Sequence, residues 1–218
     1  QVAVASSTPV SGLRFVANEG AWDTAVRFVV LGSPQPAIVR SDGFALAVRG
    51  AGGHGACVSF RAGGGAREVV GEDPFDAPVH VLRAATATSA TSYSRVRLRE
   101  AWPGVDVLLR ADSSGGGRGV LAYDLVVRDA EALATVAIEV DGATRLESCD
   151  DGTLAFAVEL GDGTAVTLVQ GAPHTFARRG GVDVPLHSRV VVLGERSFGF
   201  AVDDVAPGES FCIDPGFV

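Results

Sequence analysis

Short runs of alternating apolar and polar residues, rich in Val, recur along the whole chain. Gly, Asp-Gly or Pro interrupts these runs about every 8–12 residues. Alternation with a period of two is typical of half-buried strands, and Asp-Gly favours the tight turns that join antiparallel neighbours. The pattern therefore predicts an all-β protein with mostly antiparallel, sandwich-like sheets, many hairpins, and little or no helix.

The predicted strands cover both halves of the chain. They are Arg14–Val16, Ala25–Leu31, Ala37–Arg40, Phe44–Arg49, Ala56–Arg61, Val79–Arg83, Tyr93–Arg97, Val105–Ala111, Leu121–Val127, Thr135–Val140, Arg145–Ser148, Leu154–Glu159, Ala165–Val169, His174–Arg178, Val182–His187, Val190–Leu193, Ser197–Val202 and Phe211–Ile213. The first residues, QVAVA, also alternate, and we expect them to pair within their own sheet rather than with a neighbouring subunit. Only Arg128–Thr135 contains a run of helix formers, which predicts one helical turn or a bent loop.

Turn signals separate the predicted strands. They lie at residues 41–43, 141–142, 150–152, 162–163, 179–181 and 207–208, and the Gly-rich segments Gly50–Gly55, Gly63–Gly65 and Gly115–Gly119 are predicted to be hairpin tips. The first of these segments, GAGGHG, lacks the Lys-Ser/Thr ending and the following helix of a phosphate-binding loop.

With 218 residues, the chain has the length of a single all-β unit. An alternative division has a smaller N-terminal lobe, 1–85, and a larger β-sandwich lobe, 93–218. Residues 84–92, AATATSATS, are small, polar and uncharged. They fit either a linker between the two lobes or an extended edge segment.

The composition excludes several classes of protein. The chain is 47% hydrophobic with a net charge of −8, which argues against disorder and against nucleic-acid binding, since phosphate contacts need a basic face. No run of about 18 apolar residues is present to predict a membrane span. The chain begins with Gln1 rather than Met, and a mature secreted protein fits this best. Its three cysteines, Cys57, Cys149 and Cys212, are expected either to form one disulfide beside a buried thiol or to be three buried thiols.

No catalytic, cofactor-binding or metal-ligating residue is predicted. The histidines, His54, His80, His174 and His187, do not have metal-ligand spacing or stand beside a nucleophile motif. Acidic residues gather at Asp150–Asp151, Asp203–Asp204, Glu72–Asp73–Asp76 and Asp162. Most adjoin Gly or Pro, where Asp is favoured because its side chain bonds the local backbone, so turn chemistry is preferred to Ca²⁺ binding or glycoside hydrolysis. Trp22 and Trp102 are too few for a sugar-binding face and are interpreted as core or sheet-edge anchors.

Several segments, in a consistent order, resemble an uncharacterised domain of secreted bacterial proteins that lies N-terminal to β-propeller-type SBBP repeats. FVANEGAWDTAVRF (15–28) resembles its opening F-x-x-N-x-G-Q stretch, with Ala21 in place of the usual Gln. The later segments that resemble it are WPGVDVLLR (102–110), GVLAYDLVV (119–127), DGATRL (141–146), DGTLAF (151–156), QGAPHTF (170–176) and CIDPGF (212–217). The resemblance implies an extracellular all-β module and supplies no catalytic residues.

These observations together predict a non-catalytic structural or adhesive module, secreted or on a bacterial cell surface. Its expected partners are other protein subunits, further copies of itself, or the rest of a larger surface protein, with no nucleic acid, no membrane span and no cofactor. Two alternatives stay open: a carbohydrate- or Ca²⁺-binding module, and a subunit of an extracellular filament or sheath assembled by strand-edge pairing. Two carboxylates about 5–9 Å apart in a groove would instead indicate a glycosidase.

Overall fold

The computed structural model describes residues 2–5, 12–83, 86–112 and 119–216. Within that part the chain forms 21 strands and one short helix, and the all-β, antiparallel prediction is confirmed. The helix, α1 (Ala130–Leu133), is a single turn capped by Asp129, whose Oδ1 accepts a hydrogen bond of 2.8 Å from the Ala132 amide. No helix of the described chain is long and apolar enough to cross a membrane.

The strands follow one another with short connections. They are β1 (Val2–Ala5), β2 (Arg14–Ala17), β3 (Val26–Leu31), β4 (Ala37–Arg40), β5 (Gly43–Arg49), β6 (Gly55–Ala62), β7 (Glu68–Pro74), β8 (Val79–Arg83), β9 (Thr86–Ala90), β10 (Ser92–Trp102), β11 (Val105–Asp112), β12 (Val120–Val127), β13 (Ile138–Asp141), β14 (Arg145–Ser148), β15 (Leu154–Glu159), β16 (Ala165–Gln170), β17 (His174–Arg179), β18 (Val182–Leu186), β19 (Ser188–Gly194), β20 (Ser197–Val202) and β21 (Phe211–Asp214).

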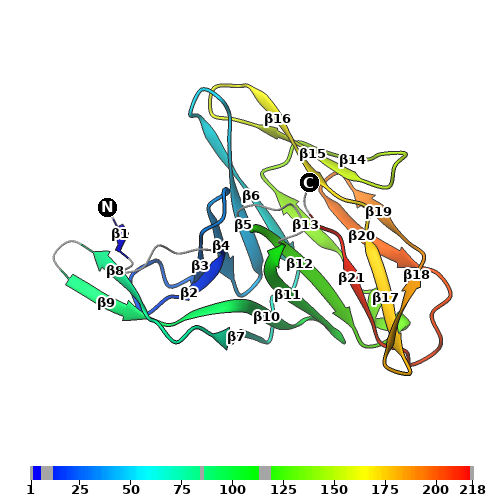
Figure 1. Ribbon diagram of the computed structural model, residues 1–218. Coiled ribbons are helices and arrows are strands. Elements are labelled where there is room, and N and C mark those ends of the chain that lie inside the picture. The colour runs from blue at the N-terminus through cyan, green and yellow to red at the C-terminus, as the bar shows by residue number, and fades with distance from the viewer. Residues whose placement is uncertain (1, 6–11, 84–85, 113–118, 217–218) are drawn as a thin grey trace.

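Three sheets organise these strands (Figure 1). The largest has the order β18-β17-β21-β12-β11-β10-β2-β3-β4-β5-β6-β13-β20-β19, with β7 on the other edge of β10. A sheet of β14, β15 and β16 lies over one end of it, at the top of Figure 1. The third sheet, β1-β8-β9, extends from the body at the left of Figure 1.

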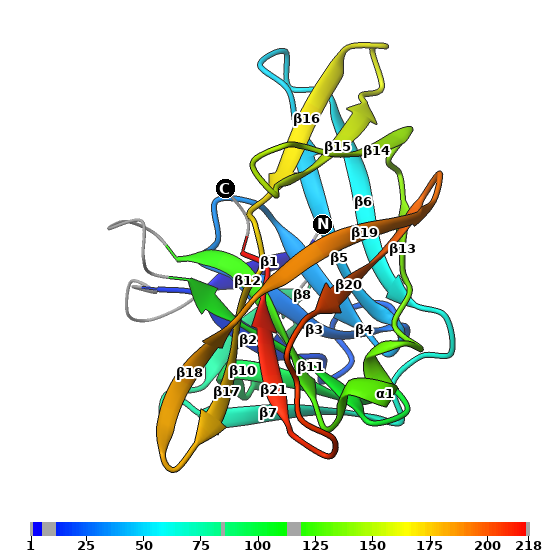
Figure 2. The ribbon, with the colours of Figure 1, turned by 90° about the vertical axis from the view of Figure 1, so that its right-hand side faces the viewer.

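The two ends of the largest sheet meet. Its outermost strands, β18 and β19, are consecutive in the chain and run as one continuous ribbon in Figure 2. The amide of Asp203, just after β20, donates a hydrogen bond of 2.9 Å to the carbonyl of His187, the residue that joins β18 to β19. Close by, Thr175 Oγ1 donates to Ser188 Oγ at 2.7 Å. The sheet therefore closes around its core, while β1, β7, β9, β14 and β16 each pair with a single described strand.

Aromatic side chains link the layers inside. Phe44 on β5 meets Tyr123 on β12 at a ring-centroid distance of 5.4 Å. Phe156 on β15 contacts both Phe60, at 5.4 Å, and Phe198, at 5.8 Å, and so joins the β14–β16 sheet to the main core. Such ring pairs contribute about 0.5–1.5 kcal/mol each beyond the area they bury.

A second, smaller core lies under the β1-β8-β9 sheet. It contains Val16 from β2 together with Val79 and Val81 from β8, and the half-buried Trp22 packs against it. Trp102, in contrast, is 8% exposed and belongs to the main core. β1 pairs with β8 of the same chain, with Val2 opposite Arg83, as expected for QVAVA.

The structure contains one strand that sequence reasoning did not predict, β7, and it makes residues 86–90 an edge strand, β9, which was one of the two alternatives for that segment. The segment that forms β7, EVVGEDP, has only two adjacent apolar residues, yet it pairs with β10 along its length. Tyr93 of β10 lies directly over Gly71, where an added Cβ would stand 2.5 Å from the ring. Strand β9 falls within residues 84–92 and pairs with β8 at the edge of its sheet.

Several predicted turns are hairpins and others are not. The turns at 41–43, 150–152, 162–163 and 179–181, and the tip at Gly50–Gly55, do join neighbouring strands. The turn at 141–142 and the segment Gly63–Gly65 connect strands that do not pair with each other, so for these two the hairpin prediction is wrong. Residues 207–208 form a turn between β20 and β21, as predicted. Most of Gly115–Gly119 lies outside the described residues.

Candidate functional site

The four histidines lie on separate elements. His54 is in the tip between β5 and β6, and His80 on β8 has its Nδ1 3.2 Å from Ser89 Oγ. His174 begins β17, and His187 Nδ1 lies 2.9 Å from Asp203 Oδ2. Among the residues that the structure describes, no group of three or more His, Cys, Asp and Glu side chains is placed to hold a metal ion.

The acidic residues next to glycines bond their own turns. Asp151 accepts from the amide and hydroxyl of Thr153 at 3.0 and 2.7 Å, and Asp162 accepts from the amide of Thr164 at 3.0 Å. These hydrogen bonds lower the pKa of both carboxyl groups. The carboxyl of Asp203 lies beside His187 and accepts a hydrogen bond from Arg189, and these two partners lower the pKa of Asp203.

All three cysteines are free, and both cysteine expectations are therefore wrong. Cys57 on β6 and Cys149 in the turn after β14 are both exposed to solvent. Cys212 on β21 is half-buried, and burial together with the nearby carboxylates of Asp124 and Asp214 raises its pKa to about 12. A thiol with this pKa stays protonated and is a poor nucleophile at neutral pH.

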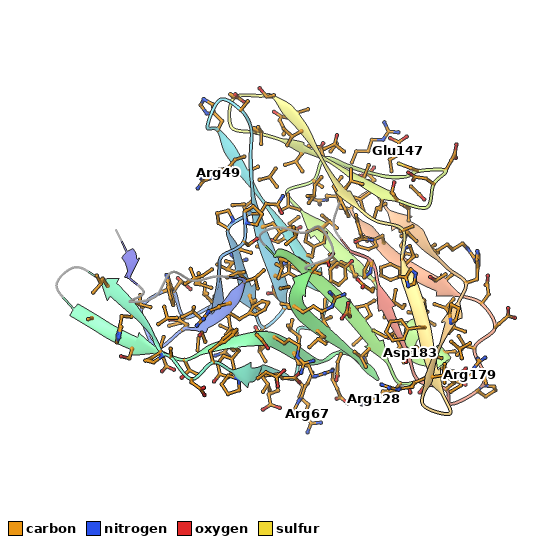
Figure 3. The ribbon with its side chains drawn as sticks, viewed as in Figure 1. Arg49, Arg67, Arg128, Glu147, Arg179 and Asp183 are labelled. Atoms are coloured by element: carbon orange, nitrogen blue, oxygen red, sulfur yellow. The ribbon has the colours of Figure 1, made fainter. Side chains whose placement is uncertain are left out.

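Two neighbouring strands carry opposite charges on one face. Arginines alternate with apolar residues along β10, and acidic residues stand opposite them on β7. Arg97 Nε lies 2.6 Å from Glu72 Oε1, and Arg99 NH1 lies 2.9 Å from Glu68 Oε2. The same side of the molecule carries Arg128, labelled in Figure 3, which bonds Glu100 at 2.8 Å. We call these residues, with Arg110, Asp124 and Asp214, the ion-pair face.

One part of the ion-pair face is a triad of Arg110, Asp124 and Asp214. Arg110 on β11 donates two hydrogen bonds to Asp124 on β12, at 2.8 and 2.9 Å, and one to Asp214 on β21, at 2.5 Å. Asp124 is only 6% exposed. Burial raises the pKa of Asp214, and the two carboxylates raise that of Arg110. Sequence reasoning missed this triad, although each member is a charged residue within an otherwise apolar strand.

The triad brings two carboxylates together, which is the arrangement that would have indicated a glycosidase. Both, however, bind the same guanidinium, which occupies the space between them. A glycosidase needs an acid and a base or nucleophile on either side of an accessible sugar bond. Neither Asp124 nor Asp214 lines the hollows described below. The triad therefore neutralises charge on a sheet surface.

Asn18 organises the loop between β2 and β3. Its Nδ2 lies 2.8 Å from the carbonyl oxygen of Asp23, 2.9 Å from that of Val26 and 3.3 Å from that of Trp22. Its Oδ1 accepts from the amides of Gly20 and Trp22, both at 3.1 Å. One side chain thus adds five hydrogen bonds to the backbone bonds that the loop makes with itself and with the start of β3.

Replacing Asn18 with Asp is expected to lower the free energy of unfolding by about 1–3 kcal/mol at neutral pH. A carboxylate would face three carbonyl oxygens without a proton to donate, while the volume of the side chain stays the same. Urea denaturation measures the loss, which should shrink as the pH falls and the carboxyl is protonated. A variant as stable as the wild type at pH 7 would contradict this role of Nδ2.

Among the described residues, we consider one small cavity inside the body and three hollows on the surface. The cavity, about 20 Å³, is lined by Phe44, Phe60 and Tyr123 and has room for about one water molecule. The first hollow, about 470 Å³, lies beside Arg40 and Gly63–Gly65. The second is an apolar hollow of about 460 Å³ beside Cys57. The third and largest, about 1000 Å³, surrounds Trp22.

Comparison with known protein families shows to which family the chain belongs. Residues 15–216 match the model of a domain of unknown function, DUF7948. The chain belongs to the DUF7948 family. The DUF7948 match begins in β2 and ends after β21, so it includes every strand of the largest sheet and leaves out β1. No curated protein and no solved structure matches this DUF7948 chain.

Proposed function

We propose that this DUF7948 chain is a non-catalytic structural or adhesive module of a secreted or cell-surface bacterial protein, placed before SBBP repeats. Its partners would be the rest of that larger protein, other subunits or further copies of itself. The closed sheet supports this proposal most. Because β18 continues into β19 through His187 and Ser188, the two ends of the largest sheet are joined into one closed body.

The ion-pair face supports the same proposal. Its charges are paired with one another across neighbouring strands, so they fix the strand register and keep the sheet surface polar. A module displayed outside the cell benefits from a polar surface that does not aggregate. The filament alternative rests on free strand edges; in this chain QVAVA occupies the edge of β8 rather than projecting as a donor strand.

Cells that produce the protein provide the test. We expect deletion of the DUF7948 segment to reduce attachment of the cells to surfaces or to one another. Complementation with the wild type or with Arg145→Met, which removes a single exposed ion pair, should restore attachment. Complementation with Gly142→Ala, which is expected to destabilise the fold, should not. Unchanged attachment after deletion would contradict an adhesive role.

A further inference from the structure

We infer that the third of these hollows, of about 1000 Å³, is a binding site for a neutral saccharide, centred on Trp22. The inference rests on the proposed adhesive function and gives it a ligand class. The hollow lies over the β2–β3 loop and holds one half-buried aromatic ring among polar side chains, with Asp23, Thr24 and Arg27 around Trp22.

The polar groups of this hollow are free to bind a ligand. Within the described part of the chain, the Trp22 indole N–H, the Thr24 hydroxyl and the Arg27 guanidinium have no bonding partner. Asp23 uses one carboxylate oxygen to accept from the Ala25 amide at 2.8 Å, and its other oxygen has no bond to a described residue. The hollow thus offers three donors and one acceptor beside an aromatic face.

This combination of an aromatic ring with polar groups is suited to bind a sugar. A pyranose presents C–H groups on one face, which pack on an aromatic ring, and hydroxyls around its rim, which need both donors and acceptors. Trp22 would supply the ring, and Asp23 and Arg27 the charge-assisted hydrogen bonds. Glu19 and Asp23 outnumber Arg27 at this loop, and the whole chain has a net charge of −8, so a neutral saccharide is favoured over an acidic one.

The site is also held in place before binding. Asn18 fixes the loop through its bonds to Gly20, Trp22, Asp23 and Val26. A preorganised loop loses less conformational entropy when a ligand binds. An extended peptide fits less well here, since β2 and β3 both lie inside the sheet, with neighbours on each side, and offer no free backbone edge for strand addition.

The two tryptophans make a direct test feasible, because Trp102 is buried and Trp22 is not. The full chain is titrated with neutral hexasaccharides of β-linked glucose, N-acetylglucosamine and mannose while tryptophan emission is recorded. We expect at least one of them to change the emission of the wild type and of Trp102→Phe, and none to change that of Trp22→Phe. Calorimetric titration of Arg27→Gln should show about tenfold weaker binding.

Absence of any change with all three sugars, or a change that persists in Trp22→Phe, would overturn the inference. Circular dichroism of each variant confirms that it is folded. If Trp102→Phe does not fold, the comparison of Arg27→Gln with the wild type by calorimetry replaces it, and equal affinities would overturn the inference as well. Failure here leaves the attachment experiment to decide the proposed function separately.

Discussion

Replacement of Gly142 with Ala is expected to lower the free energy of unfolding by about 3–5 kcal/mol. Two costs add up: alanine is strained in a left-handed backbone conformation, and its Cβ overlaps neighbouring atoms. Gly142 has a φ of 89°, and an added Cβ would stand 2.1 Å from the carbonyl oxygen of Cys57. The obstacle is backbone within β6, a strand paired on both sides, so it cannot move aside cheaply. Urea denaturation of the purified chain measures the effect.

Gly163→Ala is the matched control. Gly163 also follows an Asp and has a φ of 79°, but nothing lies within 4 Å of an added Cβ. It should lose only about 1–2 kcal/mol, the cost of a left-handed conformation for alanine. Equal losses for the two variants would contradict the close approach of the β13–β14 connection to β6.

Replacement of Arg110 with Met is expected to cost about 2–4 kcal/mol at pH 7, somewhat less than a fully buried pair would, because the triad is partly exposed. Methionine fills much of the volume but leaves the buried Asp124 and the half-buried Asp214 without a counter-charge. Arg145→Met, which removes an exposed partner of Glu147, should change stability little.

The pH dependence of Arg110→Met gives a second test. Burial raises the pKa of the Asp214 carboxyl, and removal of Arg110 takes away the positive charge that opposes this rise. Stability relative to the wild type should therefore be recovered as the pH falls toward the raised pKa of Asp214 and lost as it rises. If the difference in unfolding free energy between Arg110→Met and the wild type is the same at pH 7 and pH 5, lost packing rather than uncompensated charge causes the destabilisation.

The fold class follows from the sequence because alternation is a local signal. Most predicted strands agree with the structure to within a few residues, since each buries a row of alternate apolar side chains. Strand β7 was missed because it lacks a row of alternate buried apolar residues. Its pairing depends on β10, whose arginines bind the exposed Glu68 and the half-buried Glu72. The closure of the sheet depends on contacts across distant strands, which no local pattern specifies.

Three of the four Asp-Gly turns illustrate the same limit. Asp150–Gly152 and Asp162–Gly163 join paired strands, whereas Asp141–Gly142 leads from one sheet into another. Their local sequences are alike, and only tertiary packing distinguishes them. For the candidate site, sequence reasoning singled out the segment around Asn18 by resemblance, but not the Asn18 bonds or the free groups around Trp22, which depend on how the loop folds back.

The most direct test of the proposed location outside the cell uses the exposed thiols. Intact producing cells are treated with a maleimide that cannot cross membranes, and the protein is then recovered from cells and medium. We expect Cys57 and Cys149 to be labelled without lysis and the half-buried Cys212 to stay unlabelled, with Cys57→Ser/Cys149→Ser as the unlabelled control. Labelling of Cys57 and Cys149 only after the cells are broken would contradict an extracellular module.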